Sequence, residues 1–372
     1  MRRLLYIVSP ENNKRSKNGS GAVPRRRPFV RARDRSLAAV GSALFLNLLS
    51  LPKKKKKKQD HNPNVWYTED GRRLGNYVGH NGAVSTCDVS RESDLLLTGS
   101  ADSSAKLWDV KTGECHATWS FDAPCKAVAF ALGDEMAALS TDPFMARDPA
   151  IHLVAIDRGD PSSSGQGQGG DGGGGAGGGG APGVLRKLTG FKGRTNRVAF
   201  TDGNACLLSA GEDGVLRRWD VETGQVRDEA AVAEGPLTDL QLSADGTHLV
   251  VSSLDTRARL VDAVSLEVLK TYQTGTNANA VAIHPQFPHV LVGGGQEASQ
   301  VTTTGSRAGK FEARFFHTVY AEEVGHVRGH FGPINAVAFT PDGRSFATGG
   351  EDGYVRLHHF DSDYFKLGSR ES

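Results

Sequence analysis

The 372-residue sequence has few cysteines and no long apolar run, and both absences narrow its possible functions. Its four cysteines, Cys87, Cys115, Cys125 and Cys206, form no Cys-x-x-Cys pair and show no metal-ligand spacing. This pattern favours a reduced, intracellular compartment, where free cysteines act as small buried hydrophobes. No stretch reaches the roughly 18–20 apolar residues that a membrane-spanning helix needs, so we expect no membrane partner.

Organised sets of catalytic residues are also missing. The glycine-rich strings at 293–296 and 349–352 lack the Gly-Lys-Ser/Thr of a phosphate-binding loop. No carboxylate pair or Cys/His cluster has the pattern of a metal site. We therefore expect no enzyme activity, no catalytic residue, no metal and no cofactor.

Charge is distributed unevenly along the chain. Residues 1–59 contain 17 lysines or arginines but only Glu11 and Asp34, a net charge of +15. The other residues carry 27 basic and 40 acidic side chains, a net charge of −13. Because an acidic surface does not attract a phosphate backbone, we expect no direct nucleic-acid binding by this larger part.

The basic leader, residues 1–59, allows three interpretations. It is rich in arginine and contains an apolar run at 36–51, as a transit peptide would. Six consecutive lysines at 53–58 suggest a nuclear signal or a ribosome or RNA contact. The interpretation that we favour is a disordered extension, or a leader altered by splicing or gene modelling.

A spacing repeat runs through the acidic part. Asp102 lies 22 residues after His80, and Trp108 lies 28 residues after it. His330, 250 residues further on, again precedes an aspartate, Asp352, by 22 residues. Both histidines follow a glycine. Between each histidine and its aspartate lie short apolar runs separated by Gly, Asp or Pro turns, and this pattern indicates an all-β fold.

The repeat period is 42 residues, as measured from Trp66 to Trp108 and from Trp219 to Val261. Longer intervals arise from a glycine-rich flexible insertion at 159–183 and from extra residues within QEASQVTTTGSRAGK. About seven units result. A period of 40–45 residues with Gly-His and Trp-Asp signatures predicts a seven-bladed WD-repeat β-propeller.

The predicted propeller spans residues 60–365 and is followed by a tail at 366–372. Its first unit keeps only its second half, since no Gly-His lies 22 residues before Asp60. We therefore expect the first blade to be incomplete. Propellers of this type commonly close with an N-terminal strand that completes the last blade; here we expect that strand to be missing, or supplied by an unrelated segment such as Leu4–Val8, and the ring to be poorly sealed. In the sixth unit we expect QVTTT and KFEARFF to form the later strands.

The residues His80, Thr98 and Asp102 invite a comparison with a hydrolase triad. The same residue types recur at the same offsets in the seventh unit, whereas an active site is usually single. We therefore interpret them as a hydrogen-bonded network that holds each blade and leaves no buried polar group unpaired. The predicted network comprises His80, Thr98, Asp102, Trp108, Asp213, Trp219, His330, Thr348 and Asp352, of which Asp213 holds its turn without a histidine.

Several segments are more specific than generic WD repeats, notably HVLVGGGQEASQVTTT, AGKFEARFFH, EEVGHVRGHFGPINAVAF and GGEDGYVRLHHFDSDYF. In these, and in NVWYTEDGRRLGNYVGHNGAV, the chain resembles the WD-repeat subunit i of eukaryotic translation initiation factor 3. The resemblance covers residues 60–365. It implies a non-catalytic, cytoplasmic scaffold that binds the C-terminal helical segment of subunit b, and also subunit g. Such a scaffold supports pre-initiation complex assembly and scanning on the small ribosomal subunit, which it contacts indirectly.

The resemblance also implies where the partner helix docks, since acidic residues of the middle-to-late blades meet basic residues of that helix. The matching positions are Asp239 and Asp255, although Asp255 could serve only to hold its turn. We expect Asp239→Lys to weaken partner binding without changing thermal stability. Two other functions stay open on the same architecture: a generic WD-repeat adaptor in signalling, for example one that binds a receptor kinase, and a propeller hydrolase.

Overall fold

The computed structural model describes residues 4–7, 61–67, 73–156, 183–295, 311–361 and 363–365. The rest of the basic leader, the glycine-rich insertion up to residue 182, the segment QVTTT and the predicted tail lie outside the described residues. In the described part, no helix is long and apolar enough to cross a membrane.

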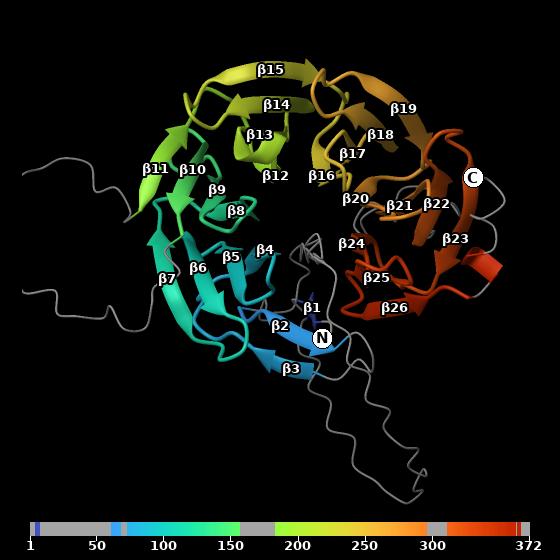
Figure 1. Cartoon of the computed structure of the whole chain (residues 1–372), viewed down its shortest axis with the longest axis horizontal. Coiled ribbons are helices and arrows are strands. Elements are labelled where there is room, and N and C mark those ends of the chain that lie inside the picture. Colours follow the sequence, from blue (N-terminus) through green and yellow to red (C-terminus); the bar gives the residue numbers. More distant parts are fainter. Residues whose placement is uncertain are drawn as a thin grey trace, which may run out of the picture.

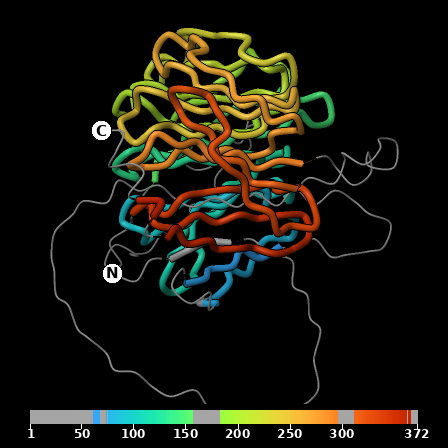
Figure 2. Tube along the Cα trace, turned by 90° about the vertical axis from the view of Figure 1, so that its right-hand side faces the viewer, coloured from blue at the N-terminus to red at the C-terminus, as the bar shows by residue number. Residues whose placement is uncertain are grey.

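The described strands form seven antiparallel sheets that are arranged as blades around a central axis (Figure 1). The predicted seven-bladed WD-repeat β-propeller is therefore confirmed. Seen from the side, the strands β2 and β3 of the first sheet lie beside the strands of the last sheet, so the first and last blades are neighbours in the ring (Figure 2).

Five sheets have four strands each, ordered from the axis outwards. Blade 2 contains β4 (Val84–Val89), β5 (Leu95–Ser100), β6 (Ser104–Asp109) and β7 (Cys115–Ser120). Blade 3 contains β8 (Cys125–Phe130), β9 (Met136–Thr141), β10 (Ala150–Ala155) and β11 (Val184–Leu188). Blade 4 contains β12 (Thr195–Thr201), the short 3-10 helix η1 (Asp202–Asn204), β13 (Cys206–Gly211), β14 (Val215–Asp220) and β15 (Val226–Ala231).

Blade 5 contains β16 (Leu237–Leu242), β17 (His248–Ser253), β18 (Arg257–Asp262) and β19 (Val268–Gln273). Blade 6 contains β20 (Ala278–Ile283), β21 (His289–Gly294), β22 (Glu312–His317) and β23 (Glu323–Arg328). The expectation for this blade was partly wrong, because KFEARFF supplies its third strand but the fourth, β23, follows the turn at 318–322.

The first and last blades have three described strands each. Blade 1 contains β1 (Leu4–Ile7), β2 (Asn64–Tyr67) and β3 (Arg73–Asn76), and blade 7 contains β24 (Ile334–Phe339), β25 (Ser345–Gly350) and β26 (Val355–His359). The first blade is therefore incomplete in the described part of the chain, as predicted. The suggestion that the segment at 4–8 completes the last blade is wrong, because β1 pairs with β2 in the first blade and not with β26 in the last.

The second strand of each complete blade is buried on both faces. All six residues of β5, and all six of β13, are buried. A sheet that is covered on both sides shows no polar alternation, which explains runs such as Leu95–Leu97. Each apolar core is shared by two successive blades; for example, Leu107 of blade 2 packs in the same cluster as Leu139 of blade 3. No blade could bury its faces alone.

A row of side-chain hydrogen bonds links the innermost strands of successive blades. The second residue of such a strand donates to the carbonyl oxygen of the first residue in the next innermost strand. The donor–acceptor pairs are Ser85–Cys125 (2.9 Å), Asn196–Leu237 (2.6 Å), Thr238–Ala278 (2.7 Å) and Asn279–Ile334 (3.3 Å). This inter-blade seam gives each of these carbonyl groups a side-chain donor from the preceding blade.

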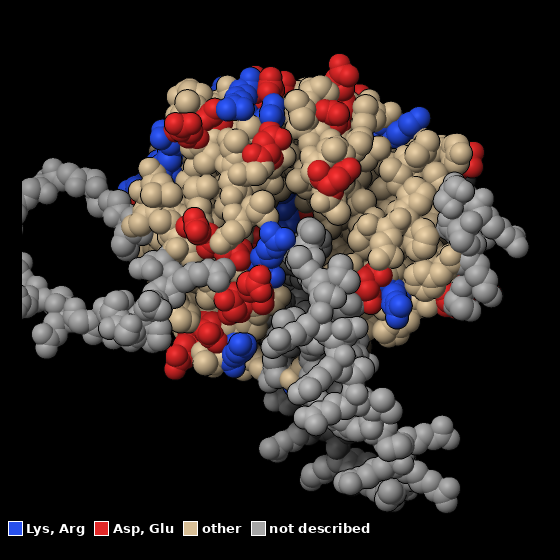
Figure 3. Space-filling model, viewed as in Figure 1, with Lys and Arg blue, Asp and Glu red and all other residues tan. Residues whose placement is uncertain are grey.

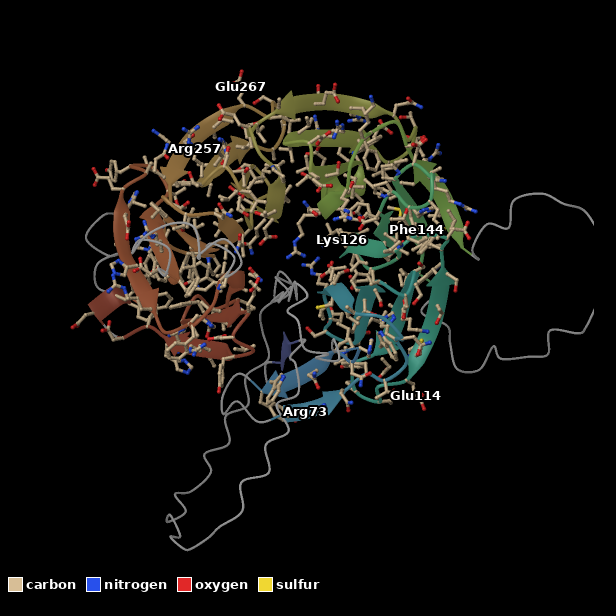
Figure 4. All side chains as sticks on the ribbon, turned by 180° about the vertical axis from the view of Figure 1, so that it is seen from behind. Arg73, Glu114, Lys126, Phe144, Arg257 and Glu267 are labelled. Atoms are coloured by element: carbon tan, nitrogen blue, oxygen red, sulfur yellow. The ribbon has the colours of Figure 1, made fainter. Side chains whose placement is uncertain are left out.

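Blade 3 departs from the seam because Lys126 occupies its second position; Figure 4 shows this residue on the inner side of the ring. Between blades 3 and 4 the hydroxyl of Ser140 donates to the carbonyl of Thr195 instead, at 3.3 Å. In blade 7 the equivalent Asn335 donates to Glu351 of its own blade at 3.4 Å.

The seam predicts the effect of a conservative substitution. We expect Thr238→Val, which removes the hydroxyl but keeps the shape, to lower the free energy of unfolding by about 1–3 kcal/mol, because the Ala278 carbonyl loses its donor. Urea denaturation of the full chain measures this. The exposed Thr118→Val serves as a control and should change stability by less than about 0.5 kcal/mol. Equal stability of the two variants would contradict the prediction.

Candidate functional site

Blade 2 contains a complete polar network that joins the loop before β4, the strands β5 and β6, and the turn between these two strands. The indole Nε1 of Trp108 donates to Thr98 Oγ1 at 2.9 Å, and Thr98 Oγ1 lies 2.8 Å from His80 Nε2. His80 Nδ1 lies 2.9 Å from Asp102 Oδ2, which also accepts the backbone N–H of Asn81 at 2.8 Å. The network therefore fixes the loop before β4 against the turn between β5 and β6.

The protonation states follow from burial and hydrogen bonding. Burial lowers the pKa of His80, although the contact with Asp102 opposes this effect. Burial raises the pKa of Asp102, but hydrogen bonds from Ser104, the Asn81 backbone and His80 outweigh it and hold this pKa well below its usual range. At neutral pH the imidazole is therefore neutral, and its Nδ1–H donates to an ionised carboxylate.

Blade 7 repeats this arrangement with two changes. His330 Nδ1 lies 3.0 Å from Asp352 Oδ1, and His330 Nε2 lies 2.8 Å from Thr348 Oγ1. The position of the tryptophan is taken by His358, whose Nε2 is 3.4 Å from the same threonine oxygen. The guanidinium of Arg356 donates to Asp352 at 3.0 Å.

In blades 4 and 5 an arginine replaces the histidine as donor to the turn aspartate. Arg217 donates to Asp213 at 2.7 Å, and Arg259 donates to Asp255 at 2.6 Å. Sequence reasoning missed these arginines, although an Asp-x-x-x-Arg pattern was available as a signal in both units. Trp219 Nε1 donates to Ser209 Oγ at 2.8 Å, so this tryptophan also has its hydroxyl partner.

Asp239 lies on β16, which lines the central channel, and its residue is 8% exposed. Its carboxylate accepts from Arg197 Nε at 2.6 Å and from the backbone N–H of Val281 at 3.2 Å. These contacts join the innermost strands of blades 4, 5 and 6. The expectation that Asp239→Lys leaves thermal stability unchanged is inconsistent with this environment, because the substitution would set two buried cations side by side.

Asp255 is also enclosed, with 8% of its side chain exposed beside Arg259. Burial raises the pKa of Asp255, but the hydrogen bond and charge of Arg259 hold it below its usual value. The same carboxylate accepts the backbone N–H of Glu234 at 3.3 Å. Asp255 therefore fixes the loop between β15 and β16, and Glu234 on that loop is exposed.

The two enclosed carboxylates contrast with the charged surface of the ring. On the face seen in Figure 3, acidic side chains are distributed around the ring with basic ones among them. The exposed Glu212, in the turn after β13, lies near the loop of Glu234, since Val232 of that loop donates to Gly214 at 3.1 Å. The described residues include no group of three or more His, Cys, Asp or Glu side chains arranged to hold a metal ion.

Sequence comparisons identify the family. The model of the EIF3I family matches residues 56–369 of this chain. A protein from Culex quinquefasciatus named eukaryotic translation initiation factor 3 subunit I is 41% identical over 311 residues, which are 83% of this chain and 90% of that protein. Proteins of the same name from Bombyx mori and Drosophila melanogaster are each 41% identical, over 82% and 83% of this chain and 88% and 90% of their own lengths.

The chain belongs to the subunit I family of eukaryotic translation initiation factor 3. The resemblance described above is therefore confirmed. Membership makes this propeller a subunit of a translation initiation factor rather than an enzyme. The repeated His-Asp-Thr sets agree with this, because each is closed by hydrogen bonds within its own blade.

The blade network predicts a loss of stability in His80→Ala. Removal of the imidazole leaves the Thr98 hydroxyl and the Asp102 carboxylate without a shared partner, so we expect the unfolding free energy to fall by about 1–3 kcal/mol. Urea denaturation measures the change. The exposed His116→Ala is the control. An unchanged midpoint in His80→Ala would show that the network does not hold the blade.

Buried neutral histidines also predict a pH dependence. Burial lowers the pKa of His152 to about 4, and likewise that of His284. The unfolded chain takes up protons near pH 6.5 while the folded chain does not, so stability should fall as the pH drops from 6.5 towards 4. Each such histidine contributes a slope of up to about 1.4 kcal/mol per pH unit.

The comparison of native protein with His152→Phe measures one of these slopes. The phenylalanine would pack against Phe121, whose ring centroid lies 4.7 Å from that of His152. Urea denaturation between pH 6.5 and 5 should give a smaller loss of stability in the variant. Identical slopes in the two proteins would rule out His152 as a contributor.

Proposed function

We propose that this chain is a cytoplasmic docking subunit that binds the C-terminal helical segment of subunit b, and also subunit g, of translation initiation factor 3. In this role it supports assembly of the pre-initiation complex and scanning on the small ribosomal subunit, which it contacts indirectly. Membership of the subunit I family is the observation that carries the proposal. A rigid ring of packed blades suits docking because its loops are held in place before a partner arrives.

The docking surface that we propose comprises the loops of blades 4 and 5 around Glu212 and Glu234. Both carboxylates are exposed, and the exposed Leu254 lies in the adjacent turn after β17. Acidic side chains beside an apolar one suit a partner helix with basic and apolar residues. In this proposal Asp255 acts indirectly, since its carboxylate holds the backbone of Glu234.

Asp239 is proposed to support docking in the same indirect way. Its ion pair with Arg197 lies inside the channel and joins the strands that carry these loops. Neither Asp239 nor Asp255 needs to touch the partner for a substitution there to weaken binding.

Charge reversal distinguishes docking from folding. We expect the double variant Glu212→Lys and Glu234→Lys to reduce recovery of subunit b with the tagged chain by roughly fivefold or more, because like charges across an interface disfavour binding. Its melting temperature should match that of the native protein, since both side chains are exposed. Recovery of subunits b and g is measured by quantitative mass spectrometry after purification from growing cells.

Two further variants complete this experiment. The exposed Glu267 lies at the outer rim of blade 5 (Figure 4). Glu267→Lys is the matched control and should leave recovery of the subunits unchanged. Asp239→Lys should lower both recovery and stability, the latter by about 3–5 kcal/mol, because it breaks an enclosed ion pair. Undiminished recovery of subunit b by the folded double variant would exclude the proposed surface, and failure of the native chain to recover any subunit would exclude the function.

A further inference from the structure

The last blade ends in a strand whose outer edge has no neighbour among the described residues. In each of the five complete blades, the third strand is hydrogen-bonded to a fourth: β6 to β7, β10 to β11, β14 to β15, β18 to β19 and β22 to β23. The equivalent third strand of blade 7 is β26 (Figure 1). A free strand edge presents backbone N–H and C=O groups that can pair with another chain.

Side chains along β26 are more exposed than their counterparts in the complete blades. Val355 occupies the position at which the complete blades have residues that are at most 1% exposed, namely Ala105, Ile151, Leu216, Ala258 and Ala313. Val355 is only half-buried. Leu357 is likewise half-buried, whereas its apolar counterparts in blades 2, 3, 5 and 6 are at most 8% exposed: Leu107, Leu153, Leu260 and Phe315.

The fourth strands of the complete blades show what supplies this cover. Opposite the Val355 position they place an apolar side chain, which in three blades is large and buried: Trp119 (4% exposed), Leu188 (0%) and Tyr272 (0%). The residue just before it faces the position of Arg356. There Thr118 accepts from Lys106 Nζ at 3.0 Å, and Glu229 pairs with Arg217 at 3.3 Å.

Arg217 shows that one arginine can serve both neighbours, because it also donates to the turn aspartate Asp213 at 2.7 Å. Arg356 already donates to Asp352 at 3.0 Å and keeps 24% of its side chain exposed. Arg356 can therefore also pair with a side chain of an added fourth strand, as Arg217 pairs with Glu229.

The junction next to this edge is also incompletely filled. Its apolar cluster consists of three buried alanines, with Trp66, Val355 and Leu357 only partly buried against them. The indole Nε1 of Trp66 is buried without a hydrogen-bond partner, whereas Trp108 and Trp219 each donate to a hydroxyl. An added strand with a large apolar residue and hydroxyl-bearing neighbours would suit this place.

We propose that β26 is a docking edge for an extended segment of another protein, which adds as the fourth antiparallel strand of blade 7. The segment carries threonine or glutamate facing Arg356, followed directly by an aromatic or large aliphatic residue facing Val355. Main-chain hydrogen bonds provide the affinity of such strand addition, and the side chains at alternate positions provide its specificity. The inference does not depend on which subunits dock elsewhere on the ring.

A second copy of the chain is a poorer occupant. Two β26 strands paired antiparallel about Leu357 would set Val355 against His359 and Arg356 against His358. Such a pair supplies no large apolar side chain opposite Val355. The occupant that we propose is instead a segment with the Thr-Tyr or Thr-Trp pattern that β19 and β7 use within their own blades.

The test uses the full chain and a fluorescent peptide with the sequence of residues 267–274, EVLKTYQT, which contains the β19 strand. We expect saturable binding by fluorescence anisotropy, and binding weaker by about tenfold or more when the peptide carries Tyr272→Ser. Hydrogen exchange should slow at the backbone amides of 355–359 when the native peptide is bound. Equal binding of the two peptides, or slowed exchange confined to other strands, would overturn the proposal.

Two chain variants complete the test. Val355→Glu should abolish binding of the native peptide, whereas Val226→Glu, on the exposed outer strand of blade 4, should leave it unchanged. Circular dichroism checks that both variants fold; should Val355→Glu fail to fold, the pair of peptides decides alone. Absence of saturable binding to the native chain would also overturn the proposal. So would occupation of the edge by a second copy, or by residues 8–60 of the chain itself, which would slow exchange at 355–359 before any peptide is added.

Discussion

The pairing of each turn aspartate with a donor organises blades 2, 4, 5 and 7 of this propeller. The chain supplies the donor in two ways, with a histidine from the loop between blades in blades 2 and 7 and with an arginine four residues later in blades 4 and 5. Blade 7 combines both, since His330 and Arg356 converge on Asp352. The side chains of Asp255 and Asp352 are 8% and 5% exposed, and a carboxylate enclosed to this degree without a donor would be costly.

The same pairing explains why residues that resemble a hydrolase triad perform no chemistry in a member of this family. A catalytic base must be accessible to a substrate, and its own proton-accepting atom must be free in the resting state. In blade 2 every relevant lone pair or N–H is engaged within the network, and the imidazole of His80 is completely buried. The geometry of a triad is thus present for a structural reason.

Much of the fold was predictable because spacing is a property of the sequence alone. The 42-residue period and the turn signals gave seven units, and the repeated offsets indicated which histidines and aspartates meet. The partners Arg217 and Arg259 were not foreseen, because their Asp-x-x-x-Arg spacing indicates an ion pair only when the strand after the turn is known to bring the arginine back beside the aspartate. Burial of Asp239 was also hidden, since it depends on three strands that converge on the channel from blades 4, 5 and 6.

The inter-blade seam has a mechanical consequence. From blade 2 to blade 7 a side chain of each blade donates to the innermost strand of the next, with Ser140 of β9 taking this role in blade 3, whereas Asn335 of blade 7 donates to its own blade. Local opening in a protein begins where the fewest contacts must break. Among the described residues the seam runs from blade 2 to blade 7 and does not include the first blade, so blades 2 to 7 should move as one stiff arc and the ring should open first beside blade 1.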